Sequence, residues 1–154
     1  MKKLLISLFV ISSLFYGNHI YAEDNQDLYF IDAHSQIDRQ VSGINLVLER
    51  MADNNVKTSL LATRLKRNWK DILEWNSTHP DKIIPLIRTK SKHYKNNSRK
   101  YYKSIKRQIE TGKFKGPAEI LIYHAQKGHK APEVAVDLTD KRVSFLLDVA
   151  LANG

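Results

Sequence analysis

The sequence contains no cysteine, and this absence excludes several kinds of site. A chain without cysteine has no disulfide framework, no thiolate metal site and no cysteine nucleophile. Any bound metal would therefore be held by histidine, aspartate, glutamate or weaker oxygen donors. There is also no glycine-rich phosphate loop, no Gly-x-Ser-x-Gly elbow, no His-Glu-x-x-His helix and no internal repeat.

Long hydrophobic runs are missing too. The apolar run at residues 4–15 is shorter than the roughly 18 to 20 residues that cross a bilayer. It follows Lys2 and Lys3 and precedes the small residue Ala22, a pattern typical of a secretory signal peptide. We therefore predict a signal peptide over residues 1–22 and an exported mature chain, periplasmic or secreted, with no stable membrane anchor.

Acidic residues are fewer than basic ones. There are 25 Lys and Arg against 16 Asp and Glu, a formal net charge of +9, and residues 82–108 contain no acidic residue. Such a balance attracts anionic partners. We expect no nucleic acid as ligand, because an exported protein rarely meets it. Adsorption to anionic lipid or polysaccharide is an alternative function, carried by Lys100, Lys103, Lys106 and Arg107.

The rest of the composition is typical of one folded domain. The 154 residues are 42% hydrophobic and 27% charged, close to the globular average. Short β-prone runs alternate with amphipathic helical patterns. The predicted strands cover residues 28–31, 56–62, 82–89 and 118–123. The predicted helices cover residues 43–54, 69–76, 94–111 and 140–152.

This alternation predicts an α/β fold, because strands separated by helices pair in parallel through crossovers. Successive strands lie about 30 residues apart, the size of one βα unit. Four such units fill the mature chain, whereas a complete eight-unit barrel takes about 250 residues. We therefore expect a partial TIM-type (βα) barrel of about four units over residues 23–154. An open four-stranded parallel sheet is the competing interpretation.

Polar residues that could carry chemistry follow the predicted strands. In barrels of this kind the active groups project from the carboxyl ends of the strands. These positions hold His34, Gln36, Arg64, Arg88 and His124. If the first strand stays extended, Asp32, His34 and Gln36 share one side of it, and an imidazole at that edge suits zinc or another divalent metal.

Three segments carry a resemblance to a known family. Residues 30–36 (FIDAHSQ) resemble the first strand of the amidohydrolase superfamily, in particular of its amidohydrolase-related, metal-dependent hydrolase branch, which typically reads Asp-Ala-His-x-His. Residues 114–120 (FKGPAEI) are similar to that branch's Phe-Lys-Gly-x-x-Glu strand. Residues 147–154 (LDVALANG) resemble the helix and turn that lead into its fifth strand. Together the resemblance extends over residues 28–154.

The resemblance implies an eight-unit barrel that hydrolyses amide or ester bonds of a small molecule with a divalent metal, zinc above all. It implies His34, Gln36 and Glu119 as metal ligands, and it makes His124 and Arg88 candidate substrate-binding residues. Gln36 stands where the family has a second histidine. The family's later histidines and its late aspartate would follow Gly154, so we expect an N-terminal half-barrel with weak or absent activity alone.

A non-catalytic binding or accessory protein is the other interpretation. The exposed edges of the first and fourth strands would then pair with a second copy or with a partner chain that completes the barrel, because unpaired backbone groups invite further strands.

Overall fold

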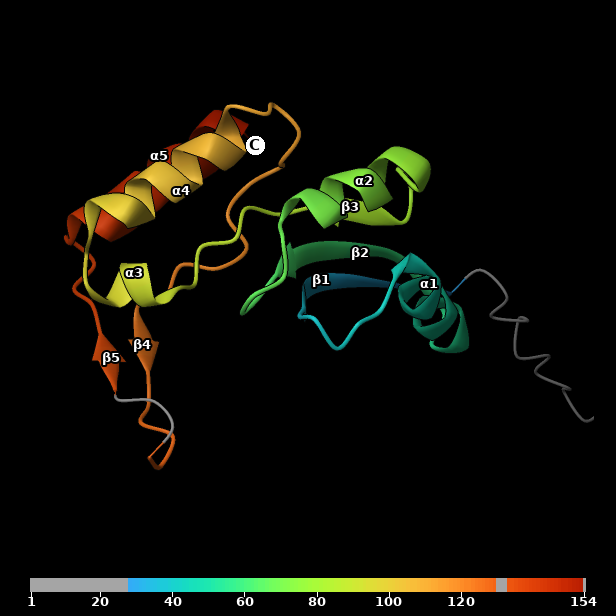
Figure 1. The fold of residues 1–154 in the computed structure, drawn as a ribbon, viewed down its shortest axis with the longest axis horizontal. Coiled ribbons are helices and arrows are strands. Elements are labelled where there is room, and N and C mark those ends of the chain that lie inside the picture. The colour runs from blue at the N-terminus through green and yellow to red at the C-terminus, as the bar shows by residue number, and fades with distance from the viewer. Residues whose placement is uncertain (1–27, 130–132, 154) are drawn as a thin grey trace, which may run out of the picture.

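A three-stranded parallel sheet begins the described part of the chain, which in this computed structural model comprises residues 28–129 and 133–153 (Figure 1). The predicted signal peptide lies outside the described residues. The strands, in their order in the sheet, are β1 (Phe30–Ile37), β2 (Val56–Thr63) and β3 (Ile83–Pro85). The crossovers are α1 (Ile44–Asp53) and α2 (Lys70–Thr78). The α/β class and the parallel pairing are thereby confirmed.

One apolar cluster holds the sheet to both crossover helices. Met51 of α1 and Trp75 of α2 pack into the same cluster as Leu61 of β2. Each fully buried side chain of this size stabilises the fold by roughly 1.5–3 kcal/mol. Because the two helices share one cluster, they cover the same face of the sheet.

β3 is shorter than predicted, and a further segment continues the sheet beside it. Proline has no amide hydrogen, and regular pairing ends at Pro85. Just beyond it, the Ile87 amide donates to the Gly116 carbonyl (2.8 Å) and the Ala118 amide donates to the Ile87 carbonyl (2.9 Å). This isolated parallel bridge brings residues 116–118 next to β3, on the side away from β2.

The fourth strand predicted over residues 118–123 is wrong. Residues 118–122 belong to no strand. Ala118 bonds to the Ile87 backbone at one end and Ile122 to the Val136 backbone at the other, but no continuous ladder joins the two. Instead, β4 (Tyr123–His124) pairs with β5 (Val134–Ala135) in an antiparallel hairpin. The sequence pattern did not indicate this hairpin.

The long helix predicted over residues 94–111 is divided in two. α3 (Lys92–Lys95) is followed by α4 (Arg99–Ile109). Between them Asn97 has φ +44°, a left-handed conformation that asparagine tolerates better than most residues. The last helix, α5 (Lys141–Asn153), confirms the prediction within one residue.

A second apolar cluster joins α4 to α5, which lie side by side in Figure 1. Tyr101 and Ile105 of α4 are buried against Val143 and Leu146 of α5, as the helical spacing predicts. The basic residues of α4 lie on its exposed face. No helix within residues 28–129 and 133–153 has both the length and the apolar character to span a bilayer.

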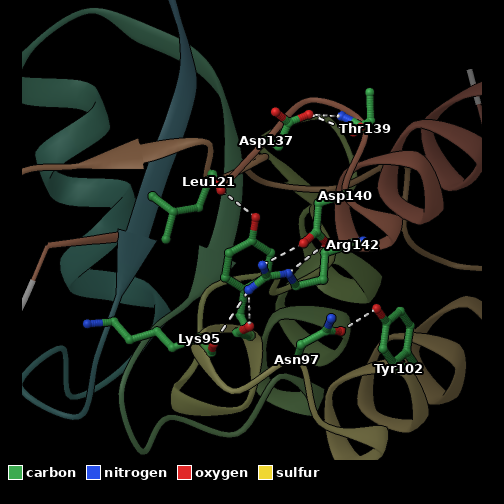
Figure 2. Close-up of polar contacts among 9 residues, drawn as sticks. Lys95, Asn97, Tyr102, Leu121, Asp137, Thr139, Asp140 and Arg142 are labelled. Atoms are coloured by element: carbon green, nitrogen blue, oxygen red, sulfur yellow. Dashed lines mark hydrogen bonds and ion pairs between the residues drawn. The ribbon is translucent and has the colours of Figure 1, made fainter. Parts of the chain in front are cut away.

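A hydrogen-bonded cluster around Arg142 fixes α5 against α3 (Figure 2). Its guanidinium donates twice to the Asp140 carboxylate (2.7 and 2.8 Å) and once to the Tyr94 carbonyl (2.9 Å). Asp140 also accepts the Arg142 amide (2.8 Å) and so caps the helix start. The hydrogen bond from Arg142 lowers the pKa of Asp140 to about 2. The Tyr94 hydroxyl donates to the Leu121 carbonyl, which ties this cluster to residues 118–122.

Candidate functional site

Three side chains predicted as a group meet at the carboxyl end of β1. The Gln36 amide nitrogen donates to Glu119 Oε1 (3.1 Å) and lies 3.2 Å from His34 Nε2. His34 Nδ1 lies 3.0 Å from the Ala118 carbonyl oxygen. A neutral imidazole with its proton on Nδ1 satisfies both contacts of the ring. Residues more than 80 positions apart in the sequence are therefore joined through Gln36.

Asp32 does not join this group, contrary to the expectation that it shares a side with His34 and Gln36. The pairing register of β1 shifts between Asp32 and Ser35, so the strict alternation of an extended strand is lost. The Asp32 carboxylate instead accepts hydrogen bonds from the hydroxyls of Ser35 and Ser59 (3.2 Å for Ser59).

Neighbouring residues hold Glu119 in place although no strand contains it. The buried Thr89 hydroxyl donates to the Glu119 carbonyl (2.6 Å), and Tyr94 holds Leu121 two residues later. The Glu119 carboxylate lies 3.8 Å from Lys90 Nζ. Glu119 is thus fixed at both backbone and side chain.

The donors of this group fit a divalent metal poorly. The Nε2 lone pair of His34 faces the Gln36 amide, and Glu119 is shared between Gln36 and Lys90. Among the described residues no group of three or more His, Cys, Asp or Glu side chains is placed to hold a metal ion. One imidazole, one neutral amide and one lysine-paired carboxylate form a weaker set than the three protein ligands of catalytic zinc sites.

Arg88 and His124, the candidate substrate-binding residues, line a cavity of about 330 Å³ next to this group. Gln36 and Glu119 also line it, so the cavity and the His34–Gln36–Glu119 group are continuous. Its lining is Gln36, Ala62, Thr63, Arg64, Leu65, Arg88, Thr89, Lys90, Ala118, Glu119, His124 and Lys127. The structure therefore brings together every predicted site residue except His34 around one cavity, with His34 bonded to its wall.

A buried glutamine sets the position of Arg88. Gln108 of α4 is fully buried; its side chain accepts the Arg88 amide (2.9 Å) and donates to the Arg88 carbonyl (3.4 Å). The Arg88 guanidinium is partly buried, and this burial lowers its pKa. Its one hydrogen bond among the described residues runs from Nε to the Lys90 carbonyl at 3.5 Å. A desolvated cation without a carboxylate partner is unusual.

The sequence patterns missed Thr63, Lys90, Lys127 and Gln108. Gln108 alone had a recognisable signal, since it lies seven residues after Tyr101 and three after Ile105, on the apolar stripe of its helix. A polar residue at a core position of a helix indicates a buried hydrogen-bonding role. Lys90 and Lys127 look like ordinary surface lysines until the tertiary structure brings them together.

A second cavity lies between β1, β2 and α1, with a volume of about 450 Å³. About half of its lining is apolar, with residues such as Val47, Met51 and Leu61. The polar lining residues are Asp32, Ser35, Gln36, Arg50, Asn54 and Ser59. The first cavity is the better candidate for chemistry because it gathers charged and titratable side chains. The resemblance that led to it stays a prediction, because no family model, no curated protein and no solved structure matches this chain.

Proposed function

We propose that this chain is an exported, amidohydrolase-related protein that binds a small molecule at the carboxyl ends of its parallel strands. The reaction class is hydrolysis of an amide or ester bond, and activity of the chain alone is weak or absent. The supporting observation is the contact of Gln36 with both His34 and Glu119. These three residues come from the two motifs that carry the resemblance.

The finer fold assignment, a partial TIM-type barrel, belongs to the same proposal. In a barrel all helices cover the outer face of the sheet, whereas a doubly wound sheet has helices on both faces. α1 and α2 share one apolar cluster on one face, and residues 116–118 lie where a fourth parallel strand would run. Both observations favour the barrel over the open sheet.

The expected weakness of the activity follows from the residue at position 36. Gln36 offers a neutral amide where the family motif has an imidazole. Lys90, beside Glu119, adds a positive charge that would repel a divalent metal ion. Weak divalent metal binding is therefore the expectation, with zinc as the ion to test.

The experiment is to restore the missing imidazole. Gln36→His should bind zinc roughly tenfold or more tightly than the unmodified chain in a calorimetric titration, because a second imidazole adds a strong ligand. Gln36→His combined with Glu119→Gln should lose that gain, whereas combination with His79→Gln, outside the site, should keep it. Hydrolysis of an activated ester, measured on the same samples, should rise with zinc affinity. Equal zinc affinities in all variants would contradict the proposal.

A non-catalytic accessory role is a second candidate because the start of β1 is apolar and exposed. Leu28, Tyr29, Phe30 and Ile31 are between 48% and 60% exposed, and β1 is an edge strand among the described residues. A further strand from a second copy or a partner chain would cover them.

A further inference from the structure

The cavity beside the His34–Gln36–Glu119 group is strongly cationic. Arg64, Arg88, Lys90 and Lys127 line it, against the single carboxylate of Glu119. Like charges gathered in a concave, partly desolvated space repel one another more strongly than they would in bulk water. Such an arrangement is costly unless an anion neutralises it.

Two of these cations are only weakly compensated within the protein. Arg64 lies 3.8 Å from Asp38, and Lys90 lies 3.8 Å from Glu119, both longer than a good charge-assisted hydrogen bond. Arg88 and Lys127 have no ion pair among the described residues.

The backbone of Arg88 is also held in place. Gln108 hydrogen-bonds to both the amide and the carbonyl of Arg88, so the backbone that carries this lining residue is fixed. A guanidinium presents a fork of donors that matches the two oxygens of a carboxylate or phosphate.

Two polar atoms in the cavity wall lack partners. Thr63 is only 2% exposed, yet its hydroxyl has no hydrogen-bond partner in the described structure, and neither does buried Nδ1 of His124. Leaving a buried polar atom unsatisfied is unfavourable. Both atoms belong to residues that line the same cavity as Arg88, so the wall of the cationic cavity contains unsatisfied polar groups.

We propose that this cavity is an oxyanion-binding site, in which Arg88, Thr63 and His124 receive the carboxylate or phosphate group of a small molecule. A volume of about 330 Å³ is at the small end of the roughly 300–1,000 Å³ of ligand pockets. The further step, that this anion is part of a substrate, rests on the proposed function; the binding itself does not.

The experiment titrates the protein with succinate and with inorganic phosphate separately, at low ionic strength, by calorimetry. Succinamide, equal in shape to succinate but uncharged, is the control ligand. Succinate, phosphate or both should bind, and succinamide should not. Binding of succinate alone identifies the group as a carboxylate, and binding of phosphate alone identifies it as a phosphate. Failure of both anions to bind, or equal binding of succinamide, would overturn the proposal.

Variants locate the binding. Arg88→Gln should lower the affinity for the anion roughly tenfold or more, because a charge-assisted hydrogen bond is lost. Arg107→Gln, an equal change of charge on the exposed face of α4, should leave that affinity unchanged. Thr63→Val should weaken anion binding severalfold.

Lys127→Gln changes an exposed side chain that the fold does not need, so this variant remains informative if Arg88→Gln unfolds. Lys127→Gln should weaken anion binding about twofold or more. Equal affinities in Arg88→Gln or Lys127→Gln and in Arg107→Gln would refute the site. Zinc binding and ester hydrolysis, measured on Gln36→His, fail or succeed independently of these results.

Discussion

Individual residues in the cavity wall reduce stability in a way that the proposed anion binding would explain. Thr63 is buried with an unpaired hydroxyl, and Arg88 is partly buried without a carboxylate partner among the described residues. In a protein selected for stability alone, apolar residues would fit these positions better. If the cavity binds an anion as proposed, the bound anion would offset part of this cost.

Thr63→Val tests this trade-off directly. The change removes an unsatisfied hydroxyl and keeps the branched shape, so the free energy of unfolding without ligand should rise by about 1 kcal/mol. Urea denaturation measures it, and Ser59→Ala, which removes a hydroxyl that is bonded to Asp32, should lower stability instead. A loss of stability in Thr63→Val would mean that the hydroxyl is satisfied in solution.

Gln108→Leu should have the opposite effect. It leaves the Arg88 amide without its side-chain acceptor, and an unpaired buried donor costs about 1–3 kcal/mol. The free energy of unfolding, again from urea denaturation, should fall by that amount. The exposed neighbour Arg107→Leu serves as control and should change stability by no more than about 0.5 kcal/mol.

At the scale of elements, the start of α5 depends on one capping carboxylate. Asp140 accepts the Arg142 amide and both guanidinium bonds (Figure 2). Because Arg142 also binds the Tyr94 carbonyl, this cap anchors α5 to α3. Asp140→Ala should cost about 1 kcal/mol of stability, as for other helix caps, whereas Asp148→Ala on the exposed side of α5 should cost less.

The cap also predicts a dependence of stability on pH. The folded pKa of Asp140 is about 2, below its ordinary value of 3.8, so the folded state binds its proton less readily than the unfolded chain does. Its contribution is complete above the ordinary value and is lost as the pH falls through 2. Thermal unfolding measured between pH 5 and pH 2 should therefore show a smaller loss of stability for Asp140→Asn than for the unmodified protein. Parallel curves would exclude the cap as the source.

At the scale of the whole molecule, the apolar start of β1 suggests association. If this edge pairs with another copy, size-exclusion chromatography with light scattering should show a concentration-dependent dimer of the protein. Ile31→Lys, at a residue that is 59% exposed, should abolish it without loss of stability, because a charge on an edge strand blocks pairing. Leu138→Lys, equally exposed but distant in sequence from β1, should not. A monomer at every concentration would contradict pairing of two copies through β1.

The exposed basic face of α4 gives the last prediction at this scale. If the protein adsorbs to anionic surfaces, sedimentation with phosphatidylglycerol vesicles should be salt-sensitive and should disappear when Lys100, Lys103, Lys106 and Arg107 are all replaced by Gln. Arg88→Gln should leave adsorption intact, which separates the surface from the cavity. Adsorption that survives the fourfold replacement would remove this alternative.

The sequence alone determined the local elements wherever their pattern is self-contained. The helices predicted over residues 43–54 and 140–152 agree with α1 and α5 to within one residue at each end. An amphipathic helix is recognisable from its own sequence, because its apolar side chains recur with the helical period. The parallel class followed from the alternation of strands and helices. The motif at residues 30–36 also led to His34, Gln36 and, through residues 114–120, Glu119.

Only the tertiary structure decided what depends on partners distant in the chain. Residues 118–122 have a strand-like sequence but form none, because their backbone bonds to Ile87 and Val136 lie at opposite ends of the segment and a strand needs a continuous ladder. The shift in β1 turns the Asp32 carboxylate away from the His34 ring for the same reason, since register is a property of a pair of strands. The cationic cavity is likewise absent from any sequence window: Thr63, Arg88 and His124 become neighbours only when the strand ends and the loop after residue 118 converge.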